Sequence, residues 1–165
     1  MRNSLNKIFF FFLIIFISGD NNDKKYNSWT SYSADPSGSK YSSLDEINTR
    51  NVKNLKLLWT YEVFDKNENH RNGIQCNPII IDDRIYMIGP DFNVHSINGE
   101  NGDLIWKYNP YPENKISGAI RGVTYYDDGV NGRIFFVSES FLYCLDALTG
   151  ELINSFGDKG RTSLN

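Results

Sequence analysis

Arg121 is a residue whose side chain could bind a ligand, and it lies between two apolar stretches. It separates "GAI", 118–120, from "GVTYY", 122–126, at the start of a segment with β-strand character. A guanidinium is permanently charged, so a site that removes it from water must supply an anionic partner. Its planar fork matches a carboxylate in a bidentate way. Arg121 therefore predicts either a site for an anionic ligand or a charged residue that caps a strand at the surface.

The residues that usually bind transition metals or form disulfides are few and scattered. His70 and His95 are isolated from each other, and the sequence has no Cys-x-x-Cys or His-Glu-x-x-His pattern. These observations argue against a transition-metal site in this chain. Cys76 and Cys144 could form a disulfide, but each lies in an apolar strand-like segment, where a free cysteine serves as a small hydrophobic residue. We favour two free cysteines.

The composition indicates a globular protein rich in β-structure. The 165 residues are 40% hydrophobic and 15% aromatic, which provides material for a core and favours strands. The length is typical of one domain. Lys and Arg number 17 against 20 Asp and Glu, a formal net charge of -3. No basic surface indicates a nucleic-acid partner.

The beginning of the chain is predicted to lie outside the folded domain. Two basic residues precede an apolar run, Ile8–Ile17, which ends at a small Ser-Gly pair, the layout of a secretory signal peptide. The run has about ten residues, short of the roughly 20 that a transmembrane helix needs, so an uncleaved anchor is the alternative. We expect a signal peptide at 1–19, a polar linker at 20–28 and a folded domain at 29–165, in an exported, periplasmic protein.

A short phrase recurs along the chain. "LLWTY" resembles "LIWKY", and "LDALTGELINSF", 145–156, resembles "INGENGDLIWKY". With Trp59, Trp106 and Asn154 as equivalent positions, the copies are about 47 and 48 residues apart, a spacing typical of repeat architectures. The two tryptophans are predicted to be structural core residues, because the repeat accounts for them without any further role.

Each of the later two copies closes a group of four predicted short strands. The first group is "NPIII", "RIYMIGP", "FNVHSIN" and "DLIWKYN"; the second is "RGVTYYDD", "GRIFFVS", "SFLYCLDA" and "GELINSF". The final "GDKGRTSLN" is expected to be a loop-like tail. No apolar face with helical period persists. Four antiparallel strands per about 47 residues are what one blade needs, so we predict an all-β chain that forms part of a β-propeller.

The repeat resembles the tryptophan-docking motif of quinoprotein dehydrogenases: a small residue, Leu-Asp, Thr-Gly and a closing Trp. The matching residues are Ser96, Asn98, Asn101, Gly102 and Trp106 in one copy, and Cys144, Asp146, Thr149 and Gly150 in the next, where Asn154 replaces the Trp. Tyr32–Tyr61 and "RGVTYYDDG", Arg121–Gly129, also resemble the N-terminal part of pyrroloquinoline quinone (PQQ) dependent sugar and alcohol dehydrogenases. The resemblance is greatest to the membrane-associated glucose dehydrogenase branch.

The resemblance implies two cofactor-binding residues. In the family the Arg of the "RG" pair contacts the quinone, which implies that Arg121 binds a PQQ carboxylate. Gln75 stands where the family often has a cofactor-contacting Glu, and an amide keeps the hydrogen-bonding reach without the charge. The catalytic Asp base and the calcium ligands of the family lie further along, so we expect no catalytic or metal-binding residue in this chain.

Two departures from the family bear on the substrate. Alcohol-oxidising members usually carry adjacent cysteines before "RG", and this chain has "ISGAI" there. Ser117 stands near the place of a His that glucose-type members can carry. These departures favour a sugar over a simple alcohol and leave both open.

The expected function follows from the resemblance and from the length. At about 47 residues per blade, the chain supplies about two to three blades of an expected eight, so we expect the N-terminal portion of a longer protein, inactive by itself. The complete protein is expected to oxidise a sugar or alcohol hydroxyl by hydride transfer to PQQ, with calcium, and to reduce a respiratory quinone or cytochrome. Membrane association is left open. The alternative is a non-enzymatic propeller scaffold of the outer-membrane assembly type.

Overall fold

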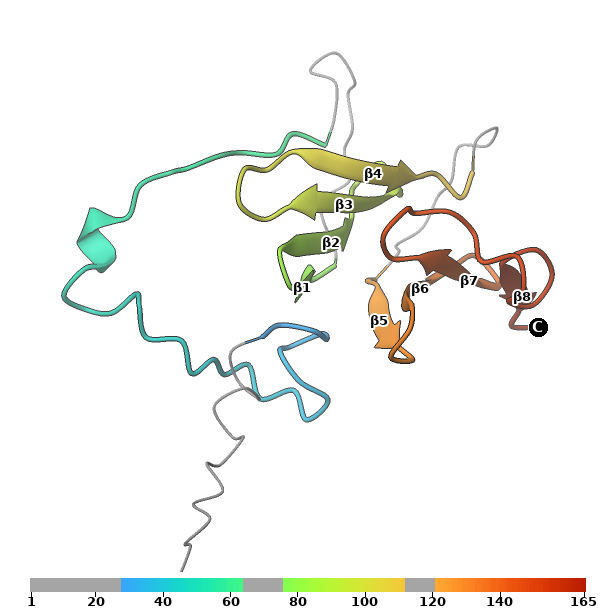
Figure 1. Ribbon diagram of the computed structural model, residues 1–165, viewed down its shortest axis with the longest axis horizontal. Helices are drawn as coiled ribbons and strands as arrows, with labels where there is room; N and C mark the ends of the chain where they lie inside the picture. Colours follow the sequence, from blue (N-terminus) through green and yellow to red (C-terminus); the bar gives the residue numbers. More distant parts are fainter. Residues whose placement is uncertain (1–27, 64–75, 112–120) are drawn as a thin grey trace, which may run out of the picture.

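The computed structural model describes residues 28–63, 76–111 and 121–165. Gln75, His70, Ser117 and the expected signal peptide lie outside these ranges. The described residues form two four-stranded antiparallel sheets, with strand orders β1-β2-β3-β4 and β5-β6-β7-β8 (Figure 1). The strands are β1 (Ile79–Ile81), β2 (Arg84–Ile88), β3 (Val94–Asn98), β4 (Leu104–Tyr108), β5 (Thr124–Asp127), β6 (Gly132–Ser138), β7 (Phe141–Asp146) and β8 (Arg161–Ser163). The all-β prediction, with two sheets of the kind that a propeller blade requires, is confirmed.

Short turns join consecutive strands from β1 to β4 and from β5 to β7, as the turn residues of the sequence indicate. Asp82 and Asp83 form the turn between β1 and β2, and Asp82 has a φ of 52°, which short acidic side chains tolerate. In the described part of the chain, the only helix is the 3-10 turn η2 (Val52–Asn54). Figure 1 shows that η2 lies on a wide excursion of the chain, which then returns to the first sheet.

The two faces of the first sheet have different neighbours. Tyr86, Ser96 and Trp106 stand opposite one another across β2, β3 and β4, so their side chains share one face. That face meets the second sheet, where the Tyr86 hydroxyl donates to the carbonyl of Ala147 at 3.1 Å. His95 precedes Ser96 and points to the opposite face, against which the opening segment packs. Because both faces are covered, β3 is buried along almost its whole length.

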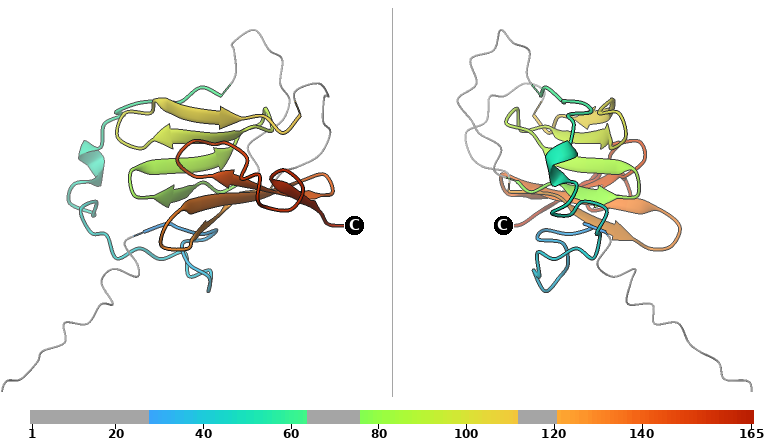
Figure 2. Two further views of the ribbon diagram at one scale, coloured as in Figure 1. Left: turned by 45° about the vertical axis from the view of Figure 1, so that its right-hand side comes forward. Right: turned by 90° about the vertical axis from the view of Figure 1, so that its left-hand side faces the viewer.

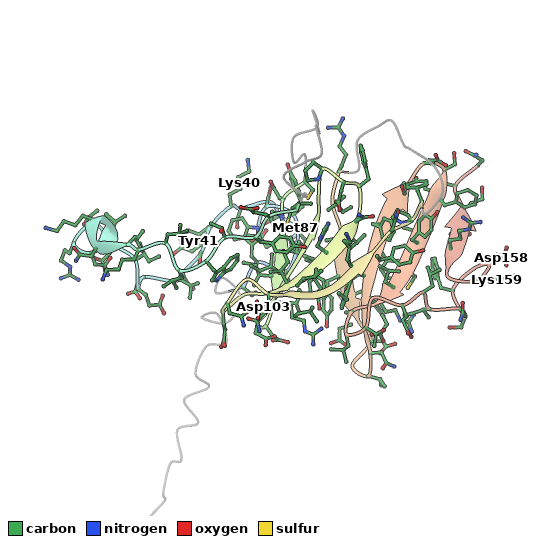
Figure 3. All side chains as sticks on the ribbon, turned by 90° about the horizontal axis from the view of Figure 1, so that it is seen from above. Lys40, Tyr41, Met87, Asp103, Asp158 and Lys159 are labelled. Atoms are coloured by element: carbon green, nitrogen blue, oxygen red, sulfur yellow. The ribbon has the colours of Figure 1, made fainter. Side chains whose placement is uncertain are left out.

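The fourth strand of the second sheet differs from the prediction. "GELINSF" supplies only an isolated bridge, Leu145↔Leu152, and the chain then leaves the sheet through a loop at 154–160. It returns as β8, which pairs with the first half of β7. The expectation that "GDKGRTSLN" is a tail after a completed strand is therefore wrong. Gly157 and Gly160 in this loop have φ values of 55° and 90°, which turn the chain back toward the sheet. Figure 3 shows Asp158 and Lys159 of the loop at the far end of the molecule.

The buried hydrophobic residues form one cluster to which both sheets contribute, and Figure 2 shows the two sheets side by side. The largest buried side chains of this cluster include Tyr86, Ile97, Ile134, Phe136 and Leu145. Both cysteines are buried free thiols. Burial raises the pKa of both thiols, as expected of cysteines that serve as small hydrophobic core residues.

The opening segment reaches the first sheet without joining it as a full strand. Its first described contact is a bridge in which the Ile80 amide donates to the Trp29 carbonyl at 2.8 Å. Further on, "LLWTY" forms no strand with any described residue, although it repeats the sequence of β4. Leu57 and Leu58 are 82% and 85% exposed, whereas their counterparts in β4, Leu104 and Ile105, are 46% and 40% exposed.

Candidate functional site

The repeated phrase has a direct structural purpose, because each tryptophan docks on a glycine of the next sheet. Trp59 Nε1 donates to the Gly99 carbonyl at 3.2 Å, and its indole lies over Gly102, where an added Cβ would come within 2.6 Å of the ring. We call this arrangement the first docking site. Gly102 has a φ of 79°, so a residue without a Cβ serves both the backbone and the close approach.

The second docking site repeats this geometry between the two sheets. Trp106 Nε1 donates to the Ala147 carbonyl at 3.0 Å, and an added Cβ at Gly150 would also lie 2.6 Å from the indole. Trp106 is a buried core residue. Asn154, at the third equivalent position, is exposed. Both docking sites are therefore structural contacts: the first joins the opening segment to the first sheet, and the second joins the two sheets.

Arg121 lies just before β5, at the edge of a cavity of about 300 Å³. The other residues that line the cavity are Gly122, Thr124, Phe135, Phe136, Val137 and Leu142. Arg121 is exposed, and no other described residue forms an ion pair with it. Both interpretations of Arg121, a site for an anionic ligand and a charged residue that caps a strand at the surface, therefore stay predictions.

The chemistry of this cavity fits a flat, anionic ligand. Aromatic and aliphatic side chains from β6 and β7 form an apolar wall, and Arg121 adds a cation at the rim. An apolar wall with a small number of placed polar groups is the usual composition of a small-molecule site. A quinone with carboxylates meets both requirements, since its rings can lie on the wall and a carboxylate can pair with the guanidinium.

Gln75, the second predicted cofactor-binding residue, lies outside the described residues, so its distance from Arg121 is not defined. The spacing along the chain nevertheless relates Arg121 to Cys76, the residue that directly follows Gln75. Arg121 precedes the first residue of β5, Thr124, by the same interval by which Cys76 precedes the first residue of β1, Ile79. The sequence therefore sets both candidates before the first strand of successive blades.

A partly buried polar network beside the segment that carries Trp59, at the other end of β3 from Gly99 and Gly102, was not anticipated from the sequence. His95 is fully buried; its Nδ1 lies 2.8 Å from the Tyr61 hydroxyl, and its Nε2 lies 3.0 Å from Asp91 Oδ1. Asn93 donates to both carboxylate oxygens of Asp91, from its backbone amide and its side chain. The sequence shows Asp91 and His95 four positions apart, but nothing in it indicates that Tyr61 joins them.

Burial and hydrogen bonding act in opposite directions on this network. Burial raises the pKa of Asp91, but hydrogen bonds from His95 and Asn93 outweigh that effect and hold the pKa of the carboxyl below its usual value. Burial, together with the nearby charge of Asp91, raises the pKa of Tyr61. Asp91 is therefore an anion and Tyr61 a neutral phenol at neutral pH.

In residues 28–63, 76–111 and 121–165, no group of three or more His, Cys, Asp or Glu side chains is placed to hold a metal ion. No helix of this part of the chain is long and apolar enough to cross a membrane.

The sequence and the fold were compared with known proteins. Residues 29–165 match the family model for PQQ proteins described as the glucose/ethanol/alcohol dehydrogenase β-propeller domain. The chain is 32% identical over 148 residues to the dehydrogenase subunit of an alcohol dehydrogenase (quinone) from Gluconobacter oxydans, a match that spans 83% of this chain. It is 31% identical over 132 residues to a 1-butanol dehydrogenase (cytochrome c) from Thauera butanivorans, spanning 76% of this chain.

Solved structures give the same result for the fold. Quinohemoprotein alcohol dehydrogenase ADHIIG from Pseudomonas putida superposes with a TM-score of 0.67 at 26% identity, over 87% of this chain and 20% of that protein. The quinohemoprotein alcohol dehydrogenase from Comamonas testosteroni also has a TM-score of 0.67, at 24% identity, over the same shares of the two chains. This chain spans only 18% of the length of the Gluconobacter oxydans relative and 18% of the length of the Thauera butanivorans relative.

Proposed function

Because the chain belongs to the glucose/ethanol/alcohol dehydrogenase β-propeller family of PQQ proteins, we propose that it is the N-terminal portion of an oxidoreductase acting on a CH-OH group, with PQQ as cofactor. The observation that carries this proposal is the family match over the whole of 29–165, which includes both sheets, both docking sites and the Arg121 cavity. The relatives named are dehydrogenases, so a non-enzymatic scaffold has less support.

An alcohol is the substrate class that the relatives support. They are named alcohol and 1-butanol dehydrogenases, and they do not support the closer likeness to membrane-associated glucose dehydrogenases that the sequence suggested. A sugar is the second candidate, because "ISGAI" stands where alcohol-oxidising members usually carry adjacent cysteines. The electron acceptor is proposed to be a quinone or a cytochrome, in line with the names of the same relatives.

Within this chain, Arg121 is proposed to bind and orient the cofactor. From the rim of the cavity its guanidinium can donate two parallel hydrogen bonds to one carboxylate, while Phe135 and Val137 exclude water beside the rings. When bound, PQQ supplies the hydride acceptor that side chains lack. Gln75 is proposed as a second, uncharged hydrogen-bonding contact. The calcium ligands and the catalytic base are proposed to lie in other parts of the protein, which is proposed to be exported to the periplasm.

The test is reconstitution of the full-length apoprotein with PQQ and calcium, followed by oxidation assays with 1-butanol, ethanol and glucose. We expect PQQ-dependent oxidation of the alcohols. If the reconstituted protein bound PQQ but oxidised only glucose, the substrate class would be a sugar. Absence of PQQ binding would support the non-enzymatic propeller scaffold.

The residue-level test is Arg121→Lys, which keeps the charge and removes the bidentate fork. We expect PQQ affinity to fall by about 1–3 kcal/mol without loss of the fold. Arg133→Lys is the matched control, because Arg133 pairs with Asp128 at 3.1 Å and does not line the cavity. Equal affinities in the Arg121 variant and the parent protein would identify Arg121 as a strand-capping surface residue.

A further inference from the structure

Each docking site has one tryptophan, but the side chains beside the two tryptophan-bearing segments differ. Tyr61 follows Trp59 by the same interval by which Tyr108 follows Trp106. Tyr108 lies on two aromatic rings, with centroid distances of 6.0 Å to Phe136 and 6.4 Å to Tyr143. Tyr61 meets the His95 ring edge-on at 5.7 Å, at the position in β3 that corresponds to Tyr143 in β7.

The hydrogen bonds around His95 form a continuous chain. Nε2 must carry a proton to donate to the Asp91 carboxylate, which accepts only. In the neutral imidazole, Nδ1 then accepts from the Tyr61 hydroxyl, and in the imidazolium the same nitrogen donates to the hydroxyl oxygen. Both protonation states of His95 therefore keep both contacts. Removal of the Asp91 charge weakens the chain at its buried end.

The packing beside Gly89 is tight. A Cβ added at Gly89 would lie 2.5 Å from Asp91 Oδ1, 2.6 Å from Val63 Cγ1 and 3.0 Å from His95 Nε2. The backbone of Gly89 thus forms the wall against which Asp91, His95 and the end of the opening segment pack. His95 is fully buried, and hydrogen bonds to a buried group are stronger than in water and depend on direction.

We propose that Tyr61, His95 and Asp91 form a positioning relay that fixes the orientation of residues 57–63 on the first sheet. His95 is the positioning residue, since it joins the opening segment to the turn between β2 and β3. The relay lies at the end of the first sheet where β2 ends and β3 begins, beside Cys76, whose thiol contacts Ile88. Arg121 lies before β5, at the equivalent end of the second sheet. The relay does not depend on the proposed function, because it involves no cofactor.

The test is amide hydrogen exchange of residues 57–63 and 104–108 in the full-length protein. Tyr61→Phe removes the hydroxyl that bonds His95, and Tyr108→Phe is the matched control at the aromatic site. We expect Tyr61→Phe to raise exchange of 57–63 by about tenfold, the loss of one buried hydrogen bond, and Tyr108→Phe to change exchange of 104–108 by less than about twofold. Equal effects at the two sites would overturn the proposal.

A double-mutant cycle separates a relay from two independent contacts. Tyr61 and Asp91 bond to different nitrogens of His95, so Tyr61→Phe and Asp91→Asn should be non-additive in a relay, by roughly threefold or more in exchange of 57–63. Additive effects would overturn the relay. The ¹⁵N shifts of selectively labelled His95 provide a second readout: we expect an Nε2-protonated ring in the parent protein, and an Nδ1-H tautomer would also overturn it.

Discussion

The two docking sites are built from the same phrase and are held differently. At the second site, Trp106 belongs to β4, which is paired along its length with β3, and its indole is fully packed between two sheets. At the first site, Trp59 belongs to a segment that pairs with no described strand, and its indole is only half-buried. The difference teaches that the repeat specifies where an indole docks, while the surroundings decide how much that contact contributes to stability.

The two sites also differ in the balance between aromatic packing and hydrogen bonding. The second site uses Phe136, Tyr143 and Tyr108, with Phe136 and Tyr143 stacked at 4.9 Å. The first site replaces these rings with buried groups that need partners, His95 and Asp91, and supplies every partner. The first site therefore buries less apolar area than the second, and its contacts include more directional hydrogen bonds.

The largest expected effect comes from deletion of the two indoles. Trp106→Ala should lower the free energy of unfolding by about 3–5 kcal/mol, because it leaves a cavity between two sheets. Trp59→Ala should cost about 1–2 kcal/mol, because less area is buried. Urea titration of the full-length proteins measures both, with Leu148→Ala as an exposed control. A loss at Trp59 as large as that at Trp106 would contradict the comparison.

A smaller effect is expected when the glycines are filled. Gly150→Ala should destabilise by about 1–3 kcal/mol, since the new Cβ meets an indole that β4 holds in place. Gly102→Ala should cost less, because the half-buried indole of Trp59 has solvent on one side, toward which it can shift. Gly129→Ala is the control, with a φ of 87° and nothing within 4 Å of the new Cβ, so it measures backbone strain alone. Thermal unfolding would refute the expectation if Gly102→Ala were the more damaging change.

The smallest effect should be acid sensitivity confined to the first site. The pKa of Asp91 is lower in the folded protein than in the unfolded chain, so its contribution is present above the unfolded pKa and is lost as pH falls through the folded value. Protection of 57–63 should fall in that window relative to 104–108. Asp91→Asn should abolish this dependence. Asp128→Asn is the control, because that carboxyl also has a lowered pKa and lies in the turn between β5 and β6. A dependence that survives Asp91→Asn would assign it to another group.

Seven of the eight strands could be predicted from the sequence, because each depends on local information. Apolar runs with intervening Asp and Gly turns define β1 to β7, and the repeat predicts that successive sheets pack on each other. The last strand was misplaced, since "GELINSF" has the composition of a strand but contributes one bridge. The choice between Leu152 and Arg161–Ser163 as partners of β7 depends on the loop at 154–160, which strand composition does not reveal.

The candidate site also has features that could be predicted from the sequence and features that could not. The family and the position of Arg121 before a strand follow from the residues themselves, whereas its exposure at the mouth of a cavity follows from how β5, β6 and β7 surround it. His95 was noted in the sequence only as isolated from His70, because one of its two hydrogen-bond partners is distant in the chain. Tyr61 lies 34 positions away.

The sequence by itself determined the period, the small residues under each indole and the alternation of each strand, because these depend on spacing along a single backbone. Only the tertiary structure decided which copies of the phrase become strands, that His95 is buried and that Arg121 is exposed. Those outcomes depend on desolvation and on partners brought together from distant segments, and both exist only after the sheets have packed.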